Sequence, residues 1–372
     1  MNCALSRRSA VLCVAALQVV VLTTSPGTPA AAAAPLPGSV LAATTATLPA
    51  ELSSLATGKR IFYVTTTVNG GTITATGLVL TPKAGKTNKT VVWGHGTTGL
   101  ADQCAPSANQ AVFWPEARAA VAALLAHGWT VTAPDYPGLG TPSAHPYLIG
   151  ASEARSMIDS VKAARSLDGA LSVTYAIDGH SQGGQGALFA GELAPSYDGA
   201  LVLSGVAAIA PVSNTDLLAP LIPGTPGQGY LVMGLYGLHA VDASVNPSAL
   251  LAAPARLRTP VLQTGCLYEI LNAYAPLTAE QLLVGGALPA ALVTKLAHYD
   301  NPAQSPPSAP ILLVQGTADE AVPYDITAGP LLEELAAYDQ PVQFVPVDGA
   351  THDGAVIATT GLVADWIAAR FG

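Results

Sequence analysis

The sequence predicts an α/β protein whose mostly parallel sheet is flanked by helices. From Lys89 onward, short apolar runs of β-forming residues alternate with helix-like stretches, which is typical of parallel strands joined by crossover helices. The chain has 372 residues, enough to bury a large core in one large domain or two smaller ones. In addition, a strand-like stretch at 171–178 leads through a glycine-rich turn into a helix-like stretch at 182–195.

The first part of the chain is predicted to differ from this alternation. Residues 34–56 are expected to form a flexible or loosely packed lead-in. The stretch 60–82 predicts a β-hairpin, because two β-forming runs flank the turn residues Asn69, Gly70 and Gly71.

The alternating part predicts strands and helices in turn. A helix over 114–128 begins at Pro115, which is suited to a first helical position, and ends at Gly128. A second helix over 152–167 carries an apolar face, and the helix over 182–195 is expected to stop at its proline. Besides 171–178, the predicted strands of this part are 90–96, 129–135, 200–211, 309–316 and 342–349.

One region interrupts the alternation, between Pro211 and Pro307. It is rich in Pro, Gly, Leu and Ala and contains no clear strand. A structureless loop of this length is uncommon in a compact domain. We therefore predict a mainly helical cap inserted at about residues 211–306, within a domain that runs from 34 to 372.

The turn at Gly179, Ser181 and Gly183 has the pattern G-x-S-x-G. Between a strand and a helix, this pattern is typical of a nucleophile elbow, where the serine is held in a strained conformation with its hydroxyl exposed. The glycines are needed because side chains there would collide with the neighbouring strand and helix. The alternative is an ordinary glycine-rich turn with a helix-capping serine.

Two later residues complete a possible catalytic set with Ser181. A nucleophilic serine needs a base to take its proton and an acid to orient that base. On the strand–elbow–helix architecture, the acid and then the histidine follow the serine along the chain. Asp319 and His352 each come just past a predicted strand, and neighbouring parallel strands end at the same edge of a sheet. We therefore predict Ser181, Asp319 and His352 as the catalytic residues.

Alternatives exist for the acid and the base. Asp216 is the best rival acid, because some hydrolases carry the acid one strand earlier, whereas Asp325 lies deeper in the next segment. The other six histidines are less suited as the base. His180 adjoins the serine, but the elbow geometry is expected to point it away.

Acyl transfer also needs hydrogen-bond donors for the developing oxyanion. The backbone N–H of Gln182, directly after the serine, is the first predicted donor. The second is the backbone N–H of Thr97, in the glycine-rich loop after the strand 90–96, with Thr98 or Gly99 as alternatives.

Residues 1–33 are predicted to be a secretory signal peptide. Arg7 and Arg8 precede an apolar core, and a run of alanines places the cleavage near Ala33. A membrane anchor is the weaker alternative, because the mainly apolar run over 10–22 is short for a span. We expect a soluble protein secreted to the extracellular space.

Export affects the cysteines and the charge. Cys104 and Cys266 remain after cleavage, and two cysteines in an oxidising compartment predict one disulfide.

Loss of the two signal-peptide arginines changes the formal charge from −9 to −11, because no acidic residue precedes Glu51. This acidic, lysine-poor composition argues against nucleic acid as a partner. No Cys/His spacing indicates zinc, and we expect a monomer with no metal, no organic cofactor and no stable membrane span.

Three blocks of sequence together resemble the secretory lipase family of α/β-hydrolases. They are the loop "GHGTTGLADQCAPS", the block beginning "APDYPGLG" and the elbow "GHSQGGQGALFAGELAPSY". The likeness covers about residues 60–370 and is strongest over 94–211. It implies the α/β-hydrolase fold, a cap inserted after the sixth strand, and hydrolysis of lipid esters. Carried over position by position, the family's triad falls on Ser181, Asp319 and His352.

The predicted function is that of a secreted serine carboxylic ester hydrolase, a triacylglycerol lipase or a carboxylesterase, with an acyl-enzyme intermediate. Its expected substrate is a small-molecule or lipid ester. Alternatives on the same fold are an acyltransferase, a serine peptidase, and a non-catalytic binding module. The apolar segment 226–241 of the cap is expected to contribute to an acyl pocket or, alternatively, to pack only as a buried cap helix.

Overall fold

A computed structural model describes residues 34–372 of the chain. The signal peptide predicted at 1–33 lies outside the described residues. The cap boundaries predicted at about 211–306 stay a prediction, although the conformation of that segment is described below.

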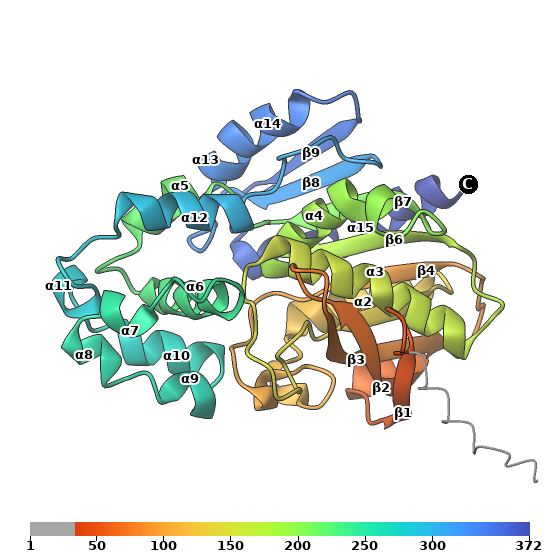
Figure 1. The fold of residues 1–372 in the computed structure, drawn as a ribbon. Coiled ribbons are helices and arrows are strands. Elements are labelled where there is room, and N and C mark those ends of the chain that lie inside the picture. The colour runs from red at the N-terminus through yellow and green to blue at the C-terminus, as the bar shows by residue number, and fades with distance from the viewer. Residues whose placement is uncertain (1–33) are drawn as a thin grey trace, which may run out of the picture. The chain divides into compact units, whose positions relative to one another are not determined.

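The described chain is built on a nine-stranded sheet with the order β1-β2-β3-β5-β4-β6-β7-β8-β9 (Figure 1). The six strands β5, β4, β6, β7, β8 and β9 are parallel to one another. The strands β1, β2 and β3 are antiparallel to their neighbours. The prediction of a mostly parallel sheet flanked by helices is confirmed. The strands are β1 (Val40–Ala46), β2 (Ala56–Thr66), β3 (Thr72–Pro82), β4 (Thr90–Gly94), β5 (Thr130–Pro134), β6 (Thr174–His180), β7 (Val202–Ile209), β8 (Ile311–Gly316) and β9 (Val342–Val347).

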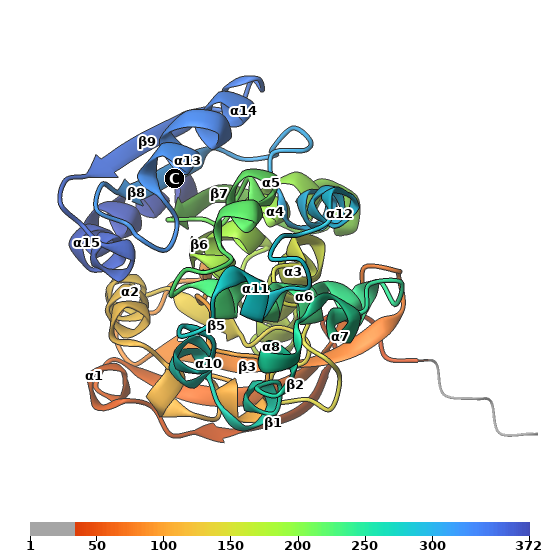
Figure 2. The ribbon, with the colours of Figure 1, turned by 90° about the vertical axis from the view of Figure 1, so that its left-hand side faces the viewer.

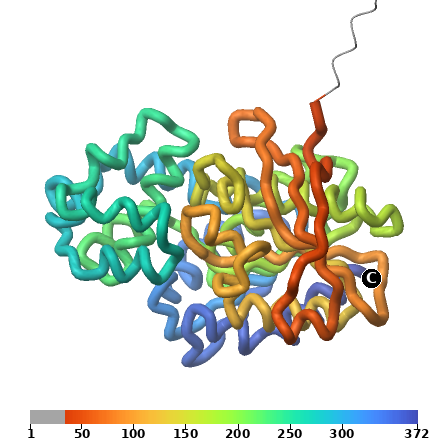
Figure 3. The backbone as a smooth tube through the Cα atoms, turned by 90° about the horizontal axis from the view of Figure 1, so that it is seen from below, coloured from red at the N-terminus to blue at the C-terminus, as the bar shows by residue number. Residues whose placement is uncertain are grey.

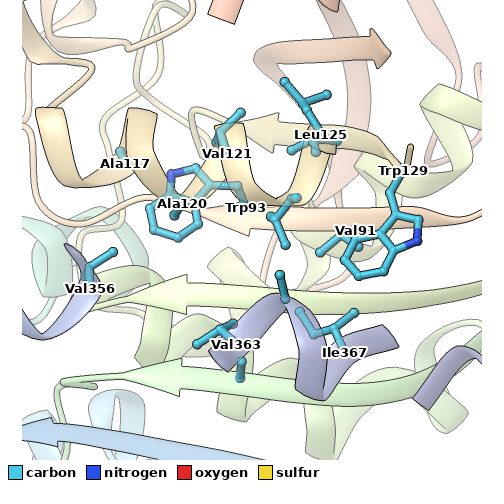
Figure 4. Packing of buried hydrophobic residues seen from close by; sticks show 14 of the residues in the cluster. Val91, Trp93, Ala117, Ala120, Val121, Leu125, Trp129, Val356, Val363 and Ile367 are labelled. Atoms are coloured by element: carbon cyan, nitrogen blue, oxygen red, sulfur yellow. The ribbon is translucent and has the colours of Figure 1, made fainter. Parts of the chain in front are cut away.

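Helices cover both faces of this sheet (Figure 2). One face packs against α2 (Pro115–Ala126) and α15 (His352–Phe371), and the other against α3 (Gly150–Leu167) and α4 (Gln182–Tyr197). Figure 4 shows the first interface, where Trp93 and Val91 of β4 lie between Val121 of α2 and Ile367 of α15. Shorter helices are α1 (Ala50–Ser53), α13 (Tyr324–Ile326) and α14 (Leu332–Ala336).

The prediction of a loose lead-in over residues 34–56 is wrong. This stretch contains β1, which pairs antiparallel with β2 along most of its length, and the short helix α1. The strand was missed because its sequence, VLAATTA, has no apolar alternation. The structure explains that composition, since five of the seven residues of β1 are exposed at the edge of the sheet.

The predicted end of α4 at Pro195 is also wrong, because the helix continues through it to Tyr197. A proline removes the N–H that would bond to the carbonyl four residues earlier. Here the freed carbonyl belongs to Gly191, and it accepts hydrogen bonds from the backbone N–H (2.8 Å) and hydroxyl (2.6 Å) of Ser308. The proline is therefore tolerated because a distant segment satisfies the orphan carbonyl.

The segment between β7 and β8 is helical and has its own hydrophobic cluster (Figures 1 and 3). Residues Tyr147 to Ile149, just before α3, belong to the same cluster and join it to the sheet domain. The contact is close at Gly237, where a Cβ atom would lie 2.3 Å from the carbonyl oxygen of Tyr147. The helices are α5 (Thr215–Leu218), α6 (Gln228–Val241), α7 (Pro247–Leu250), α8 (Ala253–Arg256), α9 (Val261–Thr264), α10 (Leu267–Tyr274), α11 (Ala279–Leu282) and α12 (Ala290–Asp300).

The predicted disulfide between Cys104 and Cys266 is present, with 5.5 Å between the Cα atoms. Cys104 is buried in the loop after β4, and Cys266 directly precedes α10. Because the sequence separation is 162 residues, the bond ties the helical segment to the loop beside the elbow.

Among residues 34–372, α15 is the one helix whose length and composition would allow it to cross a membrane. In the fold it packs against α2, β7 and β8 and contributes Val356, Val363 and Ile367 to the core. We therefore interpret α15 as a core helix.

Candidate active site

Ser181 occupies the sharp turn between β6 and α4. Its backbone dihedrals are φ 55° and ψ −117°, a combination that is unfavourable for a residue with a Cβ atom. A Cβ atom on Gly179 would lie 2.2 Å from the carbonyl oxygen of Gly183, and one on Gly183 would lie 2.1 Å from that of Gly94. The serine makes no side-chain capping bond to α4. The turn thus has the geometry of a nucleophile elbow and not that of a capping serine.

Asp319 and His352 form a hydrogen-bonded pair at the ends of β8 and β9. His352 Nδ1 lies 2.7 Å from Asp319 Oδ2. The carboxylate also accepts bonds from the backbone N–H groups of Ala321 (2.8 Å) and Val322 (2.9 Å) and from the Gln315 amide (2.8 Å). Four donors therefore fix this carboxylate, and it in turn fixes the imidazole.

The rival acids make other contacts. Asp216, on α5, accepts a hydrogen bond from the Asn301 amide at 2.8 Å. Asp325 lies on α13, beyond the loop that holds Asp319. Within residues 34–372, the carboxylate that pairs with His352 is that of Asp319.

The serine and the histidine are not hydrogen-bonded to each other in the described chain. Gly96 and His180 surround Ser181, and the His180 ring lies 4.5 Å from the His352 ring, centroid to centroid. His180 is buried, so desolvation, followed by the charge of His352, lowers its pKa well below the usual value. The expectation that His180 points away from the site is therefore only partly met, because its ring packs against the ring of the predicted base.

The residues that carry the predicted oxyanion donors both lie near Ser181. Gln182 is the first residue of α4, where a backbone N–H has no acceptor within its helix. Thr97 follows Gly96, whose Cβ position would lie 3.5 Å from Ser181 Cβ. The two alternative donors, Thr98 and Gly99, lie next to the helical segment. The Thr98 carbonyl accepts a hydrogen bond from Leu267 N, and Gly99 lies against the disulfide.

The side chain of Gln182 is held in a buried polar network that the sequence did not indicate. Its amide donates to Glu153 Oε1 (2.7 Å) on α3 and lies 3.2 Å from His145 Nε2. Burial raises the pKa of Glu153 to about 8 and lowers that of His145 to about 4, so both are neutral at pH 7. The network fixes the residue that supplies the first predicted oxyanion donor.

A cavity of about 530 Å³ opens beside Ser181 and Thr97. Its walls are mostly apolar and come chiefly from the helical segment, with Leu218, Ala219, Leu221, Ile222, Tyr230 and Leu231 among them. Five residues of the predicted acyl-pocket segment 226–241 line this cavity, whereas Met233 and Leu235 are buried in the helical cluster. The five are Pro226, Gly227, Tyr230, Leu231 and Gly234.

In the described part of the chain, one cluster of three side chains has its possible ligand atoms close enough together to hold a metal ion. It consists of His180, His352 and Asp353, with ligand atoms within 4.8 Å of one another. His352 already pairs with Asp319, and Asp353 is exposed.

The secretory lipase family model matches residues 117–372, more than half of the chain. Candida antarctica lipase A in its closed state is 20% identical, with a TM-score of 0.75 over 90% of this chain and 82% of that chain. A putative hydrolase from Legionella pneumophila is 22% identical, with a TM-score of 0.75 over 89% and 98% of the two chains. The rice cell wall degrading esterase LipA from Xanthomonas oryzae is 23% identical, with a TM-score of 0.72 over 89% and 98%. None of the curated proteins matches this chain in sequence.

A buried carboxyl beneath the elbow predicts a pH-dependent stability. Asp178 lies on β6 between Trp93 of β4 and Ala207 of β7, and burial raises its pKa to about 8. An unfolded aspartate titrates near pH 4. Between these two values the folded chain holds a proton that the unfolded chain has lost, so this group lowers the free energy of unfolding as pH rises, by up to about 1.4 kcal/mol per pH unit.

We predict that Asp178→Asn gains stability relative to the wild type as pH rises from 5 to 8. Urea unfolding at several pH values measures this difference. The exposed Asp339→Asn is the control and should leave the wild-type pH dependence unchanged. Parallel curves for the wild type and Asp178→Asn would contradict the assignment.

Proposed function

The chain belongs to the secretory lipase family of ester hydrolases, and we propose that it is a secreted serine carboxylic ester hydrolase that works through an acyl-enzyme. The observation that supports this most strongly is the Asp319–His352 pair beside a strained, elbow-borne Ser181. The pair supplies an oriented base, and the elbow supplies a serine that borders the cavity.

In the proposed mechanism, Ser181 Oγ attacks the ester carbonyl while His352 Nε2 takes its proton. Asp319 accepts the Nδ1–H of His352, which selects the required tautomer and stabilises the imidazolium. His352 then protonates the leaving alcohol. Water hydrolyses the acyl-enzyme with the same groups. Serine and histidine are not yet hydrogen-bonded in the described chain, and such contacts often tighten only once substrate is bound.

The developing oxyanion is proposed to bind the backbone N–H groups of Gln182 and Thr97. The first is free at the start of α4, and the second lies in the loop that passes Ser181. A missing donor of this kind typically costs a serine hydrolase 10²- to 10³-fold in kcat, about 3–4 kcal/mol.

Lipid esters are the proposed substrate class, because the cavity beside Ser181 is large and mostly apolar. Each buried methylene of an acyl chain contributes about 0.8 kcal/mol. Of the two relatives named above with an assigned activity, one is a lipase and the other a cell wall degrading esterase. We propose that residues 211–306 act as the cap that forms most of this acyl site.

Secretion is proposed on two grounds. The sequence of residues 1–33 has the pattern of a signal peptide. The two cysteines beyond it are joined in a disulfide, which is stable in an oxidising compartment.

Ser181→Ala should lower kcat for ester hydrolysis by several orders of magnitude, because the nucleophile has no substitute. Initial rates on p-nitrophenyl esters measure the loss, and circular dichroism confirms that the variant folds. The exposed Ser196→Ala on α4 is a matched control with expected wild-type rates. A folded Ser181→Ala that retains full activity would refute the proposed nucleophile.

Asp319→Asn should lower kcat by about 10⁴-fold with little change in KM, because the asparagine amide favours the wrong imidazole tautomer. Asp216→Asn is the control, since Asp216 bonds to Asn301 and not to His352. The two variants are compared by steady-state kinetics. If Asp216→Asn is the crippling change and Asp319→Asn is active, the acid has been assigned to the wrong strand.

A further inference from the structure

The second proposed oxyanion donor, the backbone N–H of Thr97, lies on a loop and not in a helix or strand. Gln182 is held in the first turn of α4, whereas Thr97 has no such support from regular structure. Within residues 34–372 the Thr97 N–H has no hydrogen-bond acceptor. A donor stabilises an oxyanion well only if it is in place before the reaction begins. The contacts that hold Thr97 therefore bear directly on catalysis.

The hydroxyl of Thr97 is held by Tyr147. Thr97 Oγ1 and Tyr147 OH lie 2.8 Å apart and hydrogen-bond to each other. A second hydrogen bond of Thr97 is longer, with 3.4 Å between its carbonyl oxygen and Trp114 Nε1. Thr97 is 6% exposed and Tyr147 is 2% exposed, and both residues line the cavity beside Ser181. The shorter bond thus joins two buried residues that border the reaction centre.

Tyr147 is itself fixed from two directions. Its backbone lies against Gly237 of α6, where a Cβ atom would be 2.3 Å from the Tyr147 carbonyl oxygen. The next residue is tied to α4, because the Leu148 carbonyl accepts a 3.0 Å hydrogen bond from the amide of Gln185. Gln185 lies four residues after Ser181, about one helical turn along α4. The elbow helix and the helical segment therefore set the position of Tyr147 together.

The backbone directly after Tyr147 is strained. Leu148 has a φ of 61°, in the left-handed region that a residue with a Cβ atom rarely adopts. Its N–H donates to Glu153 Oε1 at 3.2 Å, and Glu153 is fully buried on α3. A strained conformation persists only where the surrounding structure over-determines it. The segment that carries Tyr147 is therefore held rigidly against α3 and α4.

We propose that Tyr147 is a positioning residue of the oxyanion hole, because its hydroxyl holds Thr97 and so keeps the Thr97 N–H aimed at the reacting carbonyl. The inference rests on the proposed function, since it assumes that the oxyanion forms beside Ser181. Tyr147 acts through Thr97 and not on the ester itself. Loss of its hydroxyl should therefore raise the barrier to acyl transfer and leave binding of the ester in the ground state unchanged.

Tyr147→Phe tests the proposal, since it removes one oxygen atom and keeps the ring. On p-nitrophenyl butyrate, kcat should fall by about tenfold while KM stays within about twofold. This loss is smaller than that of a whole donor, because the N–H is displaced and not removed. A trifluoromethyl ketone forms a hemiketal with the nucleophile that carries the same oxyanion. Its Ki should rise by the factor by which kcat/KM falls, whereas a merely structural role would not link the two constants.

Thr97→Val provides a second test, because it removes the hydroxyl and keeps the backbone N–H and the shape of the side chain. It should lower kcat by a similar factor, and Thr97→Ser should recover most of that loss. The combined variant of Thr97→Val and Tyr147→Phe should be no slower than the slower single variant, because both changes break the same hydrogen bond.

Tyr274→Phe is the matched control and should leave kcat and KM as in the wild type. Tyr274 is another buried tyrosine of the helical cluster, and within the described chain its hydroxyl has no hydrogen-bond partner. A folded Tyr147→Phe with kcat within twofold of the wild type overturns the proposal. A loss confined to KM, or additive losses in the combined variant, also overturns it.

If Tyr147→Phe does not fold, Thr97→Val decides, because wild-type kcat in that variant overturns the proposal. Failure of the proposed function is separate, since it would appear as full activity in Ser181→Ala.

Discussion

The site depends on one steric constraint, the approach of three backbone segments at the elbow. Gly179 of β6 and Gly183 of α4 leave no room for a Cβ atom, and the carbonyl of Gly94 at the end of β4 closes the same space. This approach allows the chain to reverse over a single residue. Ser181 then carries the strained dihedrals, with the start of α4 directly behind it. A side chain at either glycine would force the strand and helix apart and move the serine.

The helical segment between β7 and β8 completes the site from the other side. The contacts that hold it against the sheet domain include the disulfide, the close approach of Gly237 to Tyr147, and the bond from Gln185 to the carbonyl of Asp300. The last of these begins on the same helix as the elbow, so the position of the cavity wall is coupled to that of the serine. Burial raises the pKa of two acids at this junction, Glu153 and Asp300, above their usual range.

The sequence predicted the features that depend on local pattern. The hairpin of β2 and β3, the alternation from β4 onward and the glycine–serine turn all have short-range signals, and so does the order of Ser181, Asp319 and His352. Features that depend on distant partners were missed. The edge strand β1 has no apolar alternation, and α4 passes Pro195 because Ser308 satisfies a carbonyl from another part of the chain. Glu153 and Asp300 were missed for the same reason, because a single buried carboxyl carries no pattern along the sequence.

The central claim is that the strained elbow presents Ser181 as the nucleophile. Reaction with a fluorophosphonate, followed by proteolysis and peptide mass mapping, measures this directly, because the reagent marks the residue that attacks its phosphorus. The structure predicts a single adduct, on Ser181, and none in Asp319→Asn over the same short exposure, since the base is then misoriented. An adduct on another serine, or an active protein that forms no adduct, would contradict the account.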